Sequence, residues 1–230
     1  MNRRAATPIL SADDNRTVAL AVGKAEARAD GEIVTVVSHA ADSYGDVALG
    51  WSALVALLAL LAFNLLPFPL LGLLENVLRL WAHRWTTHDL LALALLTVVI
   101  PFAVTWLALR WQPLRLRLTP GPIKAARVRA RANLAFRLAA QGRTRGATGV
   151  VIYLSLAEHR AEIVADHAIA AKVAPEVWGD AMHAMLGDIR AGRIAAGLAA
   201  GVDQVGQVLA AHFPRDDKPA NELPNGPIEL

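Results

Sequence analysis

Two apolar runs decide the fold of this 230-residue chain: LGWSALVALLALLAFNLLPFPLLGLL at residues 49–74 and LLALALLTVVIPFAVTWLAL at residues 90–109. Neither run contains a charged residue. The hydrocarbon core of a bilayer is about 30 Å thick, and a helix needs about 20 apolar residues to cross it. Each run is therefore long enough to cross a membrane once, and we predict spans over about residues 49–69 and 89–110.

The other interpretation of these runs is a helical hairpin buried in a soluble core. Buried core helices are usually shorter and keep some polar positions, so about 60 residues this apolar favour the membrane. Five of the six tryptophans lie near the expected ends of the spans, where indole rings prefer the interface: Trp51, Trp81, Trp85, Trp106 and Trp111.

The first span has two possible ends. Pro67 and Pro69 each restrict the residue before them, which predicts an end near Leu66. The segment 70–85 then has the helical period of a helix lying at the headgroup boundary. Alternatively the span continues, tilted and kinked, to Leu74, because membrane helices tolerate proline.

Basic residues predict the orientation. The connection between the spans carries only Arg79 and Arg84, whereas seven basic and no acidic residues follow the second span between Arg110 and Arg131. The excess of Lys and Arg marks the cytoplasmic side. We therefore expect a multi-pass protein of the bacterial inner (plasma) membrane with both termini in the cytoplasm.

Composition excludes several function classes. The chain has no cysteine, which excludes disulfides, thiol nucleophiles and cysteine-based metal sites. The net charge is +3, and much of the excess lies beside the membrane, where anionic lipid headgroups are the natural partner. No basic patch with interleaved aromatic residues is present, so nucleic acid is not an expected partner. No cleavable signal peptide is visible, and we expect the first span to direct insertion.

The flanking segments predict an α/β domain. Ser11 caps an expected helix that runs to about Ala29, and β-branched residues predict strands at 32–39 and 147–156. A third strand at 160–166 has the alternation of a hairpin partner. Further helices are expected at 121–140, 175–191 and 194–212.

The expected boundaries place the apolar hairpin inside this domain. Residues 1–48 supply its first helix and strand, residues 49–111 form the hairpin, residues 112–213 supply the remainder, and residues 214–230 read as a disordered tail rich in proline and charge. An isolated strand is unstable, so we expect the first strand to pair with the second in one sheet. If the pair is parallel, its crossover contains the whole hairpin.

The chain resembles the TPM domain family, in the branch where two transmembrane helices interrupt the domain. The matching residues are AEARADGEIVTVVSHAADSYGD (25–46), TGVVIYLSLAEHRAEIVADHAI (148–169), VWGDAM (177–182), IRAG (189–192), HFP (212–214) and NELP (221–224). The resemblance implies a three-layer sandwich in which helices flank a small central sheet. It also implies that the activity is open, because some members are acid phosphatases, some bind calcium, and most have no assigned activity. Many members carry a glycine-rich segment directly after the third strand, where this chain has Asp166 and His167 and no glycine.

A small cation site is one interpretation of the acidic residues near strand ends. Asp42, Asp46 and Asp166 could together hold Ca²⁺ or Mg²⁺, because carboxylate oxygens suit both ions. In the other interpretation Asp166 is a solvated strand end, Asp42 helps to turn the chain toward the membrane, and there is no cofactor. No calcium-loop spacing supports the site, and no nucleophile or catalytic motif is recognisable, so the catalytic residues are unknown. We read Trp178 as a core residue.

Two function classes follow. The first is a non-catalytic interaction, assembly or quality-control factor anchored in the membrane, whose tail could bind a protein partner. The alternative is a membrane-bound, divalent-metal-dependent phosphatase, which the resemblance permits.

Overall fold

The computed structural model describes residues 8–66, 72, 76, 86–141, 148–214 and 223–230. The chain forms two compact units. One unit contains Met1–Asp42 and Gly121–Leu230, and the other contains Ser43–Pro120. Each unit is described by itself.

The first unit is an α/β domain built on a four-stranded sheet in the order β3-β2-β1-β4. Its strands are β1 (Glu32–Ser38), β2 (Gly149–Ser155), β3 (Arg160–Ala165) and β4 (Ile228–Glu229). β1 and β2 are parallel, from Glu32 opposite Gly149 to Ser38 opposite Ser155. β2 and β3 form an antiparallel hairpin. The predicted strands are confirmed, and the parallel pair has the second unit inside its crossover.

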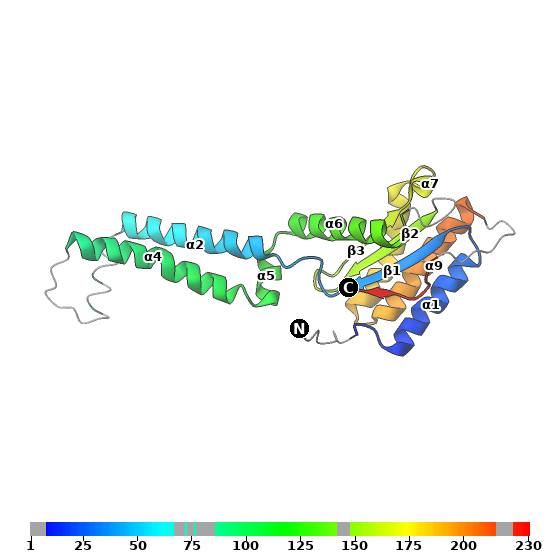
Figure 1. Cartoon of the computed structure of the whole chain (residues 1–230), viewed down its shortest axis with the longest axis horizontal. Coiled ribbons are helices and arrows are strands. Elements are labelled where there is room, and N and C mark those ends of the chain that lie inside the picture. The colour runs from blue at the N-terminus through cyan, green and yellow to red at the C-terminus, as the bar shows by residue number, and fades with distance from the viewer. Residues whose placement is uncertain (1–7, 67–71, 73–75, 77–85, 142–147, 215–222) are drawn as a thin grey trace. The chain divides into compact units, whose positions relative to one another are not determined.

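Helices cover both faces of the sheet, which gives three layers (Figure 1). On one face lie α1 (Ala12–Glu26), α8 (Trp178–Arg190) and α9 (Ile194–His212), and on the other lies α6 (Gly121–Ala139). Alternate residues of β1 and β2 point to opposite faces. Accordingly Ile33 and Val37 pack with the first group, whereas Val34 and Val36 pack with α6. Trp178 packs against the core that lies between the sheet and the helices α1, α8 and α9, as the sequence predicts.

The remaining elements of this unit are short. They are α7 (His167–Ala170) after β3 and the 3-10 helix η1 (Pro175–Val177) before α8. α1 begins as expected, because the Ser11 hydroxyl accepts a hydrogen bond from the Asp14 N–H and the Asp14 carboxylate accepts one from the Ser11 N–H. It ends at Glu26, three residues before the expected Ala29.

The expectation of a disordered tail is wrong for its last eight residues. Residues 223–230 are bound to the domain, with β4 parallel to β1 and the Leu223 side chain buried. The proline and charge content predicts disorder. Composition, however, does not show that the outer edge of β1 offers unpaired backbone groups to which this segment can bind. The rest of the tail beyond Pro214 lies outside the described residues.

The second unit is an apolar helical hairpin. Its long helices are α2 (Gly45–Leu65) and α4 (Thr87–Ala108), and they pack against each other. α2 ends just before Pro67, as the first of the two sequence interpretations expects. The segment 70–85, expected at the membrane interface, falls almost entirely outside the described residues. The basic stretch after α4 forms a short helix, α5 (Gln112–Leu118).

Small side chains form the contact face of α2. Its buried residues are Ala48, Ser52 and Ala56, spaced four apart on one side of the helix. Such spacing of small residues lets two apolar helices approach closely. The Ser52 hydroxyl is satisfied within α2, where it donates to the Ala48 carbonyl over 2.8 Å.

Candidate functional site

The carboxyl ends of β1 and β2 carry a buried polar cluster. Ligands of open α/β sheets usually bind at this edge. Ser38 and Ser155 lie opposite each other in the ladder, and Glu158 follows in the turn between β2 and β3. The Glu158 carboxylate accepts a short hydrogen bond from the Ser155 hydroxyl and further bonds from the Ala41 N–H at 3.1 and 3.3 Å. Glu158 therefore joins the β2–β3 turn to the segment that leaves β1.

Tyr153 lies next to this cluster on the α6 face of the sheet. Its hydroxyl is buried and has no hydrogen-bond partner among the described residues. Burial raises the pKa of the Tyr153 phenol, and the Ser38 and Ser155 hydroxyls lie near enough to oppose this effect, although neither meets hydrogen-bond geometry with the phenol. The cluster thus contains a hydroxyl–carboxylate pair beside a phenol.

Enclosure limits what this cluster can do chemically. Ser155 is 0% exposed and Glu158 is 8% exposed. A serine nucleophile must reach its substrate, and this hydroxyl faces only protein groups. The arrangement acts as a structural clamp in this conformation. Sequence reasoning missed Glu158 as a buried group, because its partner Ala41 is 117 residues away.

The structure does not bring the three predicted metal-binding aspartates together. Asp42 follows β1 and forms an ion pair with Arg127 at 3.0 Å. Asp166 follows β3, which runs antiparallel to β2, so it lies at the opposite end of the strands. A seven-residue strand separates its two ends by roughly 20 Å. Asp46 lies in the first turn of α2, in the other unit.

The cation-site prediction relied on nearness to strand ends and took no account of the reversed direction of β3, although the sequence also predicts β3 as a hairpin partner. A hairpin reverses the strand direction, and its carboxyl end therefore meets the amino ends of its neighbours. Asp166 caps α7 instead, and its Oδ1 accepts the His167 N–H at 2.7 Å. Among the described residues, no group of three or more His, Cys, Asp or Glu side chains could hold a metal ion.

A second acidic group, formed by the half-buried Glu26 and the buried Glu32, lies at the amino end of β1. Glu26 Oε1 accepts the Ile33 N–H at 2.9 Å, and Glu32 Oε2 accepts the Leu223 N–H at 3.1 Å. Burial is the main cause that raises the pKa of Glu26 to about 7, the Glu32 charge raises it further, and the bond from Ile33 opposes both. These carboxylates bind backbone groups that the sheet leaves unpaired.

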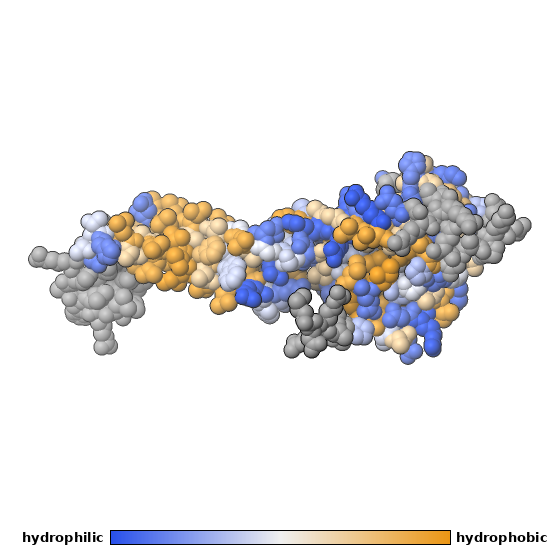
Figure 2. All heavy atoms as spheres, viewed as in Figure 1, coloured by the Kyte–Doolittle hydropathy of each residue, from blue (hydrophilic) through white to orange (hydrophobic). Residues whose placement is uncertain are grey.

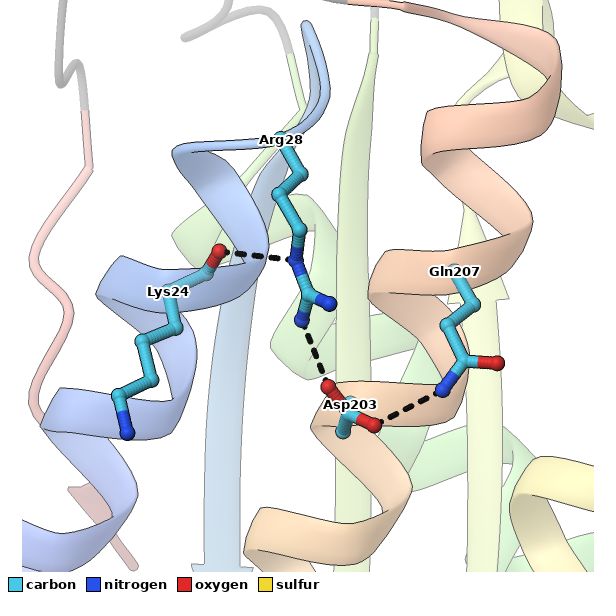
Figure 3. A network of polar contacts seen from close by, with 4 residues as sticks. All are labelled: Lys24, Arg28, Asp203 and Gln207. Atoms are coloured by element: carbon cyan, nitrogen blue, oxygen red, sulfur yellow. Dashed lines mark hydrogen bonds and ion pairs between the residues drawn. The ribbon is translucent and has the colours of Figure 1, made fainter.

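An exposed polar network joins α1 to α9 (Figure 3). The Arg28 guanidinium donates to Asp203 over 2.6 Å and to the Lys24 carbonyl over 3.2 Å. The Gln207 amide donates to the other Asp203 oxygen over 2.8 Å. The Arg28 and Gln207 hydrogen bonds lower the pKa of Asp203. Both partners of the ion pair are half exposed, so the network adds little to stability.

Comparison with known proteins identifies the domain. A family model described as the TPM domain matches residues 123–208, from the first turn of α6 to the last turns of α9. This segment of the chain carries a TPM domain. The resemblance noted from the sequence is therefore confirmed. No curated protein matches the chain.

A solved structure supports the fold beyond the matched segment. The NMR structure of the BA42 protein from the psychrophilic bacterium Bizionia argentinensis is similar, with 97% of each chain covered and a TM-score of 0.55. At 16% sequence identity this likeness concerns the fold alone. In this chain α1, β1 and β4 lie outside the family match, and β1 joins them to the matched segment in one sheet through its parallel ladders with β2 and β4.

Replacing Glu158 with alanine is expected to destabilise the TPM domain by about 2–3 kcal/mol, because the buried Ser155 hydroxyl and Ala41 N–H lose a charged acceptor. Chemical unfolding followed by circular dichroism measures this. The matched control is Glu162→Ala, whose carboxylate lies 3.8 Å from the exposed Arg129 guanidinium. It is expected to cost under about 1 kcal/mol. Equal effects of the two substitutions would contradict the clamp.

Glu26 is expected to make the TPM domain less stable as the pH rises from about 4.5 to about 7. Its pKa is raised on folding from the ordinary 4.5 to about 7, so the folded state binds the proton more tightly. The resulting stability is fully present below pH 4.5 and is lost as the pH passes through 7. We expect a loss of on the order of 1–2 kcal/mol, less than the whole shift implies, because Glu26 is only half-buried and solvent screens it.

Unfolding at pH 4.5 and pH 8 measures this slope. Glu26→Gln keeps an acceptor for the Ile33 N–H and removes the titration. The variant is expected to flatten the slope and to be more stable than the wild type at pH 8. An unchanged slope in this variant would assign the pH dependence to other groups.

Proposed function

We propose that this protein is a TPM domain anchored in the bacterial inner membrane by the α2–α4 hairpin, with the domain in the cytoplasm. The observation that carries the anchor is the exposed apolar surface of α4, of which no residue is buried. Three described helices are long and apolar enough to cross a membrane. The apolar window of α9 is 44% buried, as expected for a core helix, whereas the windows of α2 and α4 are 17% and 0% buried.

The surface of the hairpin suits lipid. Figure 2 shows apolar residues covering its two long helices. Large apolar side chains exposed by 37–67% occur along both. Among the described residues, the only charged ones in these helices lie in their first turns: Asp46 and Asp89. Soluble monomers rarely expose a continuous apolar surface of this kind.

The orientation rests on the basic end of the hairpin. Arg110, Arg115 and Arg117 follow α4 within nine residues, and the Arg110 guanidinium lies 5.5 Å from the centroid of the Trp106 ring. Arginines beside a span favour the cytoplasmic side, and tryptophans favour the interface. Asp89 and His88 lie at the opposite end of α4.

For the domain we propose a non-catalytic interaction or assembly role. Its support is that the buried Ser155–Glu158 pair is used within the fold and that Asp42 and Asp166 lie at opposite ends of the strands. The alternative, a divalent-metal-dependent phosphatase, has no observation in its favour in the described part of the chain.

Two experiments test these proposals separately. The full chain is expected to stay with membranes after an alkaline carbonate wash and to be released by detergent, and release by carbonate alone would contradict the anchor. The detergent-purified protein is expected to hydrolyse no model phosphomonoester with Mg²⁺ or Ca²⁺. Turnover that survives purification and disappears in Asp166→Asn would favour the phosphatase instead.

A further inference from the structure

The segment Leu223–Leu230, here called the strap, lies along the outer edge of β1. β4 adds Ile228 and Glu229 beside Val36 and Val37 in a parallel ladder, and the Leu230 N–H donates to the Val37 carbonyl over 2.9 Å. Without these bonds the outer edge of β1 would present unpaired backbone groups. The strap thus occupies a position that an added strand normally fills in peptide-binding domains.

A second element recognises one side chain of the strap. The Glu229 carboxylate accepts the Ile9 N–H at 2.7 Å and the Leu10 N–H at 3.1 Å. These adjacent amides precede Ser11, the N-cap of α1, and each meets a separate oxygen of the same carboxylate. Two backbone amides that point at one carboxylate form a selective acidic contact. The outer edge of β1 therefore binds the backbone of the strap, and the amide pair binds its negative charge.

The sheet does not need the strap to close its own ladders. β1 pairs with β2 over seven residues and β2 pairs with β3 over six, whereas the β1–β4 ladder has two pairs. Both residues of β4 are only half-buried and Leu230 is exposed. Leu223 is buried in the core beneath α6, and the partly buried Ile228 packs against the same core. The other contacts of the strap named above are polar, and another extended segment with apolar residues at these positions could reproduce them.

We propose that the outer edge of β1 and the Ile9–Leu10 amides form a peptide-binding site, which the strap occupies within the chain and which a partner segment of the same pattern takes by displacing it. The ligand is an extended segment with an apolar, an acidic and a second apolar residue in succession, as in Ile228-Glu229-Leu230. It adds parallel to β1 and places its carboxylate on the two amides. The site specifies which kind of segment the partner would present, and its biological use rests on the interaction role proposed above.

The test uses the full chain in detergent and a labelled peptide, NELPNGPIEL, capped at both ends. In the Glu229→Arg chain the strap loses its carboxylate contact, while β1 and the two amides stay unchanged. We expect this variant to bind the peptide at least tenfold more tightly than the wild type, whose site is already occupied. A peptide with glutamine in place of the residue equivalent to Glu229 is expected to bind the variant at least tenfold more weakly.

Equal binding of the peptide to both chains, or no binding to a variant whose circular dichroism matches the wild type, would overturn the proposal. If the Glu229→Arg chain does not fold, Glu229→Gln, which removes only the charge, takes its place under the same criteria. Failure of the membrane or phosphatase tests leaves this result unaffected, because peptide binding is measured directly on the purified chain.

Discussion

A chain in which a glycine–serine linker replaces Ser43–Pro120 is expected to leave the membrane fraction completely and to fold in aqueous buffer. The buried residues of both cores of the TPM domain come from outside this range. The ends to be joined are within reach of each other. The Asp42 carboxylate lies 3.0 Å from the Arg127 guanidinium, and Gly121 lies six residues before Arg127 in α6, about 9 Å along the helix axis. A linker of about eight residues is therefore long enough.

Sedimentation and circular dichroism measure this result. The control is the full chain expressed in parallel, which is expected to stay in the membrane pellet. A linker variant that remains with the membranes would show that surfaces of the TPM domain hold the chain there. An unfolded linker variant would contradict the assignment of the two units as separately packed bodies.

Gly206→Ala is expected to destabilise the TPM domain by about 1–3 kcal/mol, because α1 and α9 pack with almost no space between them. A Cβ atom at Gly206 would lie 2.6 Å from the Cβ atom and 3.2 Å from the Cα atom of Ala25. These atoms of Ala25 are fixed to the backbone of α1 and cannot rotate away, so the two helices would have to move apart.

The matched control is Gly187→Ala in α8. Nothing lies within 4 Å of a Cβ atom at Gly187, and alanine is the better helix former by about 1 kcal/mol. This variant is expected to raise the free energy of unfolding, and the two substitutions should therefore act in opposite directions in chemical unfolding. Stabilisation by both would contradict the close packing of α1 against α9.

The elements of this fold were predictable where the sequence signal is local. β1 and β2 are runs of β-branched residues, and Ser11 caps α1, so the strand ends and the start of α1 could be placed within two residues. The helices α8 and α9 were separated correctly because Gly192 lies between them and adopts a positive φ of 80°.

The candidate site was less predictable because its contacts join distant parts of the chain. Glu158 meets Ala41 across 117 residues, and Glu229 meets Ile9 across 220. Neither contact leaves a periodic or compositional pattern. The aspartate site is a different case, because the predicted hairpin already implies a reversed β3, and this direction places Asp166 and Asp42 at opposite ends of the strands.

The central claim is that α2 and α4 cross a membrane and leave the TPM domain in the cytoplasm. The most direct measurement uses single cysteines, because the natural chain has none. Thr87→Cys at the start of α4 and Ala211→Cys in α9 are each treated with a membrane-impermeant maleimide in intact spheroplasts. We predict labelling of Thr87→Cys at once and of Ala211→Cys only after the membrane is permeabilised. Immediate labelling of Ala211→Cys in intact spheroplasts would place the domain outside the cytoplasm and contradict the proposed orientation.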